Sequence, residues 1–195
     1  MSIALTLERY LDAKSVKYDV IAHEPTNSSI ETAKTCRIPG DCLAKAVLLR
    51  DEVGYALAVL PASHHIRLAE LRRQFGDDVS LASEHEVAEL FQDCARGAIP
   101  AVGECYGLDV VVDASIDEQL DVYFEGGDHA TLVHMTGAQF AGLTATARHN
   151  TDRSTIIPLA KNFLPPPTQN LDLNGSNFQS KVTSKLNRRI GPIRG

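Results

Sequence analysis

Lys45 is the residue whose place in the sequence most suggests chemistry. Side chains alternate between the two faces of a strand, so Lys45 shares a face with the aliphatic Leu43, Val47 and Leu49. An ammonium group buried there without a partner would cost free energy. Two interpretations follow: an edge-strand lysine whose amine reaches water, or a lysine that lines a pocket and binds a phosphate or a carbonyl oxygen.

Two glycine-containing segments could supply the remaining parts of a site. The first runs Arg96-Gly97-Ala98-Ile99-Pro100-Ala101-Val102-Gly103, and its small residues allow backbone N–H groups to approach a ligand closely. The second, Gly126-Gly127-Asp128-His129, is a turn that brings His129 to the start of a strand. The alternatives are an ordinary turn for the first segment and an ordinary polar loop residue for His129.

Several kinds of chemistry have no support in the sequence. It contains no GxSxG elbow, no phosphate-binding or dinucleotide glycine pattern, and no HExxH helix. The spacing of the cysteines matches no zinc or redox template, and the remaining histidines form no ligand pair. We therefore expect no metal, no cofactor and no nucleophilic side chain. The residues concerned are Cys36, Cys42, Cys94, Cys105, His64, His65 and His85.

Helical and strand patterns alternate along the first 146 residues. Apolar periodicity and capping residues predict helices over 6–14, 28–36, from Ser63 towards Phe75, over 83–91 and over 136–143. Strands are predicted over 18–22, 42–50, 55–60, 79–82, 108–113, 122–125 and 131–135, with 97–107 as a loop. The short spacing between the later strands, 108–113, 122–125 and 131–135, favours hairpins. The expected fold class is α/β (α+β): a central mixed, mostly antiparallel sheet with flanking helices.

The chain length and composition predict one domain followed by a tail. The 195 residues are 44% apolar, which is enough for one core, and we place the domain at 1–146. Residues 147–195 lack periodicity and contain Pro165-Pro166-Pro167, which is typical of a disordered tail. Without a readable export signal or apolar span, we expect a cytoplasmic protein that does not contact a membrane.

In order and spacing, three stretches resemble one known family. They are 43–49 with Lys45, the 97–103 loop, and 126–135 with His129, and the segment 54–62 lies between the first two. Together they resemble the YbaK and prolyl-tRNA synthetase-associated (INS-type) aminoacyl-tRNA editing domains over about residues 1–146.

The resemblance implies a function and a set of site residues. Members hydrolyse the ester between a wrong amino acid, typically alanine or cysteine, and the terminal adenosine of tRNA charged by prolyl-tRNA synthetase. By position, Lys45, Gly97, Pro100 and His129 match the family's residues. His23 and Thr26 fall in the segment that often borders the pocket. The family is not known for metal enzymes.

One departure from the family concerns its GxxxP loop. The residue four before Pro100 is Arg96, and Gly97 is only three before. Either Arg96 supplies the substrate-binding N–H with a side chain attached, or Gly97 takes over that role. Ile99 lies in the same loop and is expected to contact the substrate.

These observations predict a deacylase in which water attacks the ester and the tRNA's own ribose hydroxyl assists it. N–H groups near Gly97 and Ala98 would bind the developing oxyanion, and Lys45 would bind the terminal phosphate. Mischarged tRNA is the expected partner, and a synthetase is a further one. The alternatives are a non-catalytic tRNA or synthetase adaptor and a hydrolase of small esters.

Charge is distributed unevenly between the domain and the tail. Net charge is −6, whereas six basic residues and one acidic residue follow position 160. Contact with tRNA phosphates must therefore come from a local basic patch, the tail or a partner protein. The tail is either an electrostatic arm or a solvated terminus, and the oligomeric state is not predicted.

Overall fold

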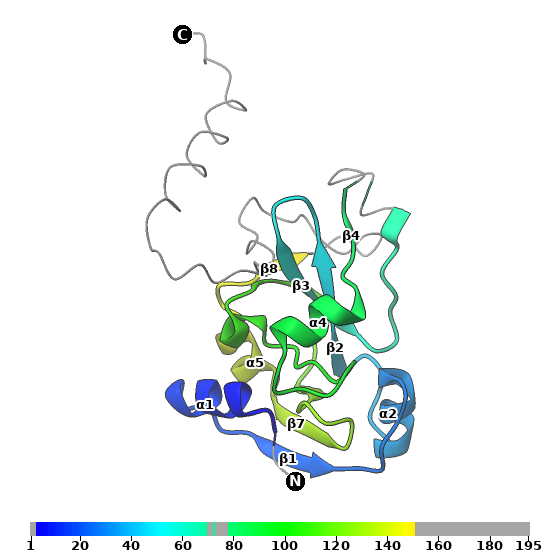
Figure 1. Ribbon diagram of the computed structural model, residues 1–195. Helices are drawn as coiled ribbons and strands as arrows, with labels where there is room; N and C mark the ends of the chain where they lie inside the picture. Colours follow the sequence, from blue (N-terminus) through cyan, green and yellow to red (C-terminus); the bar gives the residue numbers. More distant parts are fainter. Residues whose placement is uncertain (1–2, 70–71, 73–77, 151–195) are drawn as a thin grey trace.

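The computed structural model describes residues 3–69, 72 and 78–150, and Figure 1 shows their arrangement. One mixed sheet, in the order β1-β7-β6-β2-β3-β5-β8 with β4 also paired to β2, forms the centre. Its strands are β1 (Asp19–Ala22), β2 (Leu43–Arg50), β3 (Tyr55–Pro61), β4 (Ser80–Leu81), β5 (Asp109–Asp113), β6 (Asp121–Glu125), β7 (Thr131–Thr136) and β8 (Arg148–Asn150). The helices are α1 (Leu5–Ala13), α2 (Ser29–Cys36), α4 (Glu84–Leu90) and α5 (Gly137–Leu143), with a 3-10 turn η1 (Gly103–Tyr106).

The sheet confirms the predicted mixed α+β class. The pairs β1–β7, β6–β7, β2–β3 and β2–β4 are antiparallel, whereas β2–β6, β3–β5 and β5–β8 are parallel. The β2–β3 hairpin closes where Asp51 Oδ1 accepts hydrogen bonds from the N–H groups of Val53 (2.6 Å) and Gly54 (3.0 Å). This Asx-type turn fixes the register of the two central strands.

Strand β2 has an incompletely paired edge, and this feature positions the site. Strand β3 follows one edge of β2 over its whole length. The other edge is shared: β6 pairs only with Leu43 and Ala44, and β4 pairs only with Leu49 and Arg50. Residues 45–47 therefore lie where the sheet divides between β6 and β4. Ligand sites are common where neighbouring strands separate in this way.

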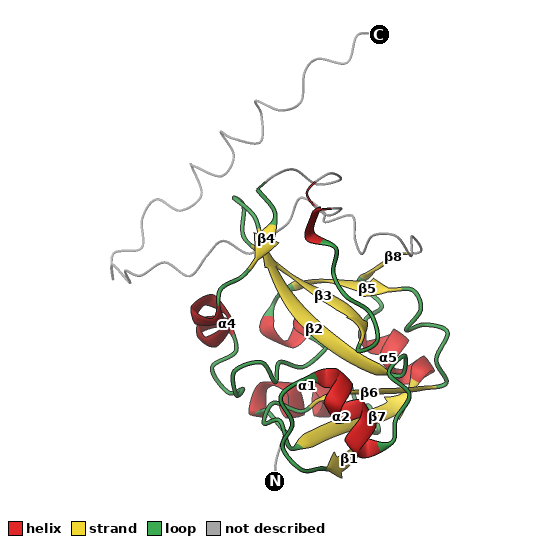
Figure 2. Ribbon diagram, turned by 90° about the vertical axis from the view of Figure 1, so that its right-hand side faces the viewer, coloured by secondary structure: helices red, strands yellow, loops and turns green. Residues whose placement is uncertain are grey.

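Helices cover both faces of the sheet (Figure 2). On one face Leu7 and Leu11 of α1 and Phe140 of α5 pack with Ala44 and Phe124 in the largest core cluster. On the other face, Ala33 of α2 packs against a smaller cluster. That second cluster contains Leu43, Ala62 and Leu132. Alternation along β2 thus places Leu43 and Lys45 on the α2 face, as the sequence pattern predicted.

Capping residues explain where three of the helices begin. Ser83 with Glu86 and Thr136 with Gln139 form complete capping boxes at α4 and α5. At α2, Ser28 accepts a hydrogen bond from the Glu31 N–H. All three caps agree with the expectation from sequence.

Two expectations about individual segments are wrong. Ser63 does not cap a helix: residues 64–67 are not helical, and its hydroxyl instead donates to Asp41. Strand β5 forms no hairpin with β6, because β2 and β3 lie between them in the sheet. Residues 148–150 form β8, and the predicted loop over 97–107 contains the 3-10 turn η1. The predicted helical positions Leu71 and Phe75 and the tail from 151 onward lie outside the described residues.

Among the helices of the described residues, none combines the length and the apolar character that a bilayer crossing requires.

We expect Gly137→Ala to destabilise the fold strongly. A Cβ at Gly137, the first residue of α5, would overlap the backbone carbonyl oxygen of Gln119, which cannot move as a side chain could. The free energy of unfolding should fall by about 2 kcal/mol or more. In the same helix a Cβ at Gly142 meets nothing within 4 Å. Urea titration should show Gly142→Ala unchanged or stabilised by roughly 0.4–1 kcal/mol; equal losses in both variants would disprove the packing argument.

Candidate active site

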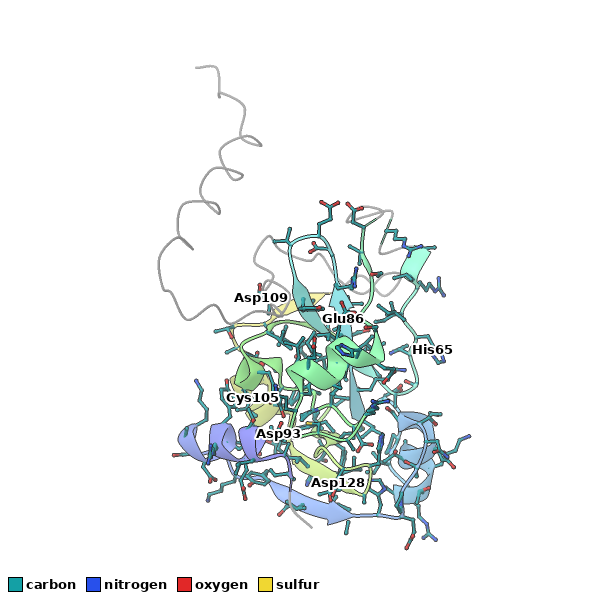
Figure 3. All side chains as sticks on the ribbon, in the orientation of Figure 1. His65, Glu86, Asp93, Cys105, Asp109 and Asp128 are labelled. Carbon is teal, nitrogen blue, oxygen red and sulfur yellow. The ribbon has the colours of Figure 1, made fainter. Side chains whose placement is uncertain are left out.

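A cavity of about 510 Å³ opens where the sheet divides. Its wall includes residues 26–30 at the start of α2, Lys45 on β2, Ala62 and His65 after β3, and Glu84 at the start of α4. The remaining wall comes from the Arg96-Gly97 segment and from Glu125 and His129, which flank the β6–β7 turn. Figure 3 shows His65 on the loop after β3 and Asp128 in the β6–β7 turn. The cavity thus joins segments that are far apart in sequence.

Lys45 is half-buried and is held by backbone carbonyls instead of a carboxylate. Its Nζ donates to the carbonyl oxygens of His64 (2.5 Å) and Ala62 (3.4 Å). Burial lowers the pKa of Lys45 from its ordinary value of 10.5. An ammonium has three donors, so one N–H is left for a ligand in the cavity. The structure therefore has Lys45 lining a pocket.

Gly97 and His129 form the wall beside Lys45. Gly97 adopts φ +84, a left-handed conformation that favours glycine, and its N–H forms no hydrogen bond with the described part of the chain. His129, itself at φ +60, donates from Nε2 to the Arg96 carbonyl oxygen at 2.6 Å. A Cβ on Gly97 would lie 3.4 Å from His129 Cε1. The histidine therefore supports the loop and leaves the Gly97 N–H available.

The other predicted loop residues do not line the cavity. The Ala98 N–H donates to the Ala95 carbonyl oxygen at 3.0 Å, and Ala98 is fully buried. Ile99 and Pro100 are buried behind the loop, where Ile99 joins the main core cluster. The reason is the turn at Ala95–Ala98, which directs only Arg96 and Gly97 towards the cavity. Of the two predicted oxyanion donors, only Gly97 therefore lines the cavity.

Of the two residues predicted to border the pocket, Thr26 lines the cavity and His23 does not. Thr26 lines the cavity, and its hydroxyl is 2.5 Å from the hydroxyl of Thr32. His23 is half-buried and is not among the lining residues. Its Nδ1 donates to the Glu24 carbonyl oxygen at 2.8 Å, and its Nε2 is buried without a hydrogen-bond partner in the described structure.

Glu125 is a lining residue that our sequence analysis did not identify. Only 7% of it is exposed, and Oε1 accepts a hydrogen bond from Thr32 at 3.4 Å. Oε2 is buried with no partner among the described residues. Burial raises the pKa of Glu125, while the nearby His23 and His129 act in the opposite direction. The sequence did contain a signal: Glu125 is a charged residue that directly follows three apolar residues at the end of β6, just before the glycine pair.

With the geometry in place, comparison with known proteins identifies the family. A model of the aminoacyl-tRNA editing domain matches residues 23–143, more than half of the chain. The chain belongs to this family. The match covers Lys45, the Gly97 loop, Glu125 and His129, so the cavity lies within the matched editing domain. A search of curated protein sequences gives no significant match.

Solved structures share the fold of this editing domain. A protein provisionally described as a trans-editing enzyme for prolyl-tRNA synthetase has a TM-score of 0.65 and 22% identity, over 75% of this chain and 94% of that chain. A scaffold protein used for computational epitope grafting has a TM-score of 0.65 and 20% identity, over 80% of this chain and 97% of that chain. A protein of Marinobacter aquaeolei VT8, provisionally assigned to signal transduction, has a TM-score of 0.59 and 22% identity, over 75% of this chain and 30% of that chain. At these identities the likeness shows the fold.

Within the described part of this editing domain, no group of three or more His, Cys, Asp or Glu side chains is placed to hold a metal ion. The four cysteines are all free thiols.

We expect Glu125→Gln to stabilise the editing domain at neutral pH. Because the pKa of Glu125 is raised in the folded state, protonated Glu125 contributes to the free energy of unfolding. This contribution is complete below about pH 4.5 and is lost as the pH rises through the raised pKa. The variant lacks this loss. Urea titrations should show it to be more stable than the wild type near pH 7, with the difference shrinking towards pH 4.

Glu52→Gln is the control, since Glu52 is exposed in the β2–β3 turn. It should show no such gain at neutral pH. A Glu125→Gln protein that is less stable than the wild type near pH 7 would contradict the burial argument.

Proposed function

We propose that this editing domain is a trans-acting aminoacyl-tRNA deacylase that hydrolyses the ester of a mischarged tRNA. The substrate we favour is the proline tRNA carrying a small amino acid such as alanine or cysteine. One observation supports this most: the half-buried ammonium of Lys45 lines the same cavity as the backbone N–H of Gly97, which has no hydrogen bond to any described residue. Such a pair suits a substrate with a phosphate close to an ester.

Lys45 binds the phosphate of the terminal nucleotide in this proposal. Two of its three donors are fixed by the Ala62 and His64 carbonyls, so the third has a defined direction. A lysine attracts phosphate as a point charge, and this electrostatic attraction is stronger where water is partly excluded. Lys45 therefore positions the acceptor end of the tRNA and takes no proton from it.

Gly97 supplies the donor for the oxyanion. A water oxygen attacks the ester carbonyl carbon, and the carbonyl oxygen gains negative charge that the Gly97 N–H stabilises. The bond to the ribose oxygen then breaks, that oxygen receives a proton, and a free amino acid and an uncharged tRNA result. The adjacent ribose hydroxyl of the tRNA orients the attacking water in this proposal, so that no protein side chain has to act as the general base.

The size of the cavity supports selection for small amino acids. At about 510 Å³ it must hold both the amino acid and part of the terminal nucleotide. A pocket excludes larger side chains by overlap, whereas it rejects smaller ones weakly. A synthetase that charges a somewhat larger amino acid and errs with smaller ones is the partner that such a sieve complements.

We expect Lys45→Ala to lower kcat/KM for deacylation of alanyl-tRNA by about 10- to 100-fold. This range corresponds to the loss of a charged hydrogen bond of roughly 1.5–3 kcal/mol. Single-turnover assays with tRNA carrying alanine, cysteine and proline provide the measurement. Lys34→Ala is the charge-matched control, because Lys34 is exposed near the end of α2. Equal rates for the wild type and Lys45→Ala would remove the lysine from the reaction, and binding without turnover on every tRNA would favour an adaptor.

We expect Gly97→Ala to reduce the deacylation rate at least tenfold while the protein stays folded. An alanine there must adopt a left-handed conformation, which costs about 1–2 kcal/mol, and relief of this strain would turn the N–H away from the cavity, although the Cβ itself would only touch His129. Gly107→Ala is the matched control, since Gly107 has φ +70 at the end of η1 and does not line the cavity. Both variants should lose similar stability in urea. A comparable loss of activity in both would show that strain alone is responsible.

A further inference from the structure

We propose that Glu125 binds the α-ammonium group of the aminoacyl ester, so that the site accepts amino acids with a free amine and rejects N-acylated ones. This inference rests on the proposed deacylase function. It assigns a specificity role to a buried side chain that lines the cavity and defines the substrate class more narrowly.

Glu125 and Lys45 each follow the last paired residue of the β2–β6 ladder, where the two strands separate. Strands β2 and β6 run parallel, with Ala44 of β2 opposite Phe124 of β6. The next residue is Lys45 on β2 and Glu125 on β6. Both line the cavity. Within the described structure they form no ion pair, because Lys45 donates to the Ala62 and His64 carbonyls. One cavity therefore presents a separate positive and a separate negative group.

The carboxylate lacks the partners that a buried charge requires. Glu125 is 7% exposed, a single 3.4 Å hydrogen bond from Thr32 reaches Oε1, and Oε2 has no described partner. Neither of the two nearby histidines is hydrogen-bonded to Glu125 within the described structure: the bonds that their rings form run from His23 Nδ1 to the Glu24 carbonyl and from His129 Nε2 to the Arg96 carbonyl. The other acidic neighbour, Asp128, accepts from the N–H of Ala130 and the hydroxyl of Thr131. A buried carboxylate in this state is matched by a cationic donor.

The chemistry of the substrate supplies such a cation. In an aminoacyl ester the ammonium is bonded to the carbon next to the ester carbonyl, so its binding group must line the same cavity as the oxyanion donor. Glu125 meets this condition together with Gly97, and Lys45 remains for the phosphate. Acylation of the amine removes the positive charge and adds bulk. Glu125 would then be left buried without a cation, which costs binding free energy.

Binding of a substrate analogue tests this inference without requiring catalysis. The probe is adenosine 5′-monophosphate with alanine attached to the 3′ position through an amide, and its N-acetyl counterpart is the comparison. Calorimetry with the full chain should show that the wild type binds the free amine at least tenfold more tightly than the N-acetyl form.

Two variants locate the effect. Glu125→Gln should lose most of the preference, chiefly through weaker binding of the free amine. Glu84→Gln removes the other carboxylate of the cavity wall, which is exposed at the start of α4, and should keep the preference. Equal wild-type affinity for the two probes, binding of neither, an undiminished preference in Glu125→Gln, or its loss in Glu84→Gln would each overturn the proposal.

Parallel deacylation of alanyl-tRNA and N-acetyl-alanyl-tRNA separates this inference from the function on which it rests. Selective binding of the free-amine probe without any turnover would refute the deacylase and leave the role of Glu125 intact. Equal turnover of both tRNAs by the wild type would support the deacylase and refute the role of Glu125.

Discussion

The site depends on one interaction, the binding of a half-buried ammonium by two backbone carbonyls. Lys45 reaches Ala62 and His64 across the end of β3, at the point where β6 and β4 leave the edge of β2. Backbone carbonyls hold the amine in place without neutralising its charge, as a carboxylate partner would. The division of the sheet provides the space into which that charge acts. The Gly97 loop and the start of α2 then only need to close the wall around it.

Within the described residues, Lys45 and Glu125 line the same cavity without an oppositely charged partner, and this arrangement lowers stability. The pKa of Lys45 is lowered and that of Glu125 is raised, so both charged forms are disfavoured by burial. Native proteins tolerate such costs mainly at functional sites, where a ligand supplies the missing partner. Around the site, the folded core is ordinary: aliphatic side chains pack on both faces of the sheet, and capping boxes fix α4 and α5.

Local features could be predicted from the sequence, whereas features that depend on distant pairing could not. The alternation around Lys45, the caps at Ser83 and Thr136, and the turn at Gly54 depend on a few neighbouring residues, and all were confirmed. Glu125 was missed because its proximity to Lys45 follows from the parallel β2–β6 pairing between segments about 80 residues apart. The Ala98 N–H was predicted to bind the oxyanion, but it donates to the Ala95 carbonyl oxygen instead. A run of small residues does not reveal this turn. The predicted β5–β6 hairpin failed for the same reason as Glu125, since non-local pairing inserted β2 and β3 between them.

The central claim is that Lys45, Gly97 and Glu125 line one cavity that binds the aminoacylated end of a tRNA. Amide chemical shifts of the ¹⁵N-labelled full chain, recorded while a non-hydrolysable 3′-alanylamido adenosine 5′-monophosphate is added, test it most directly. The account predicts saturable shifts that centre on Lys45, Gly97 and the start of α2 and that leave β8 unchanged. Shifts centred elsewhere, with these three segments unaffected, would contradict it.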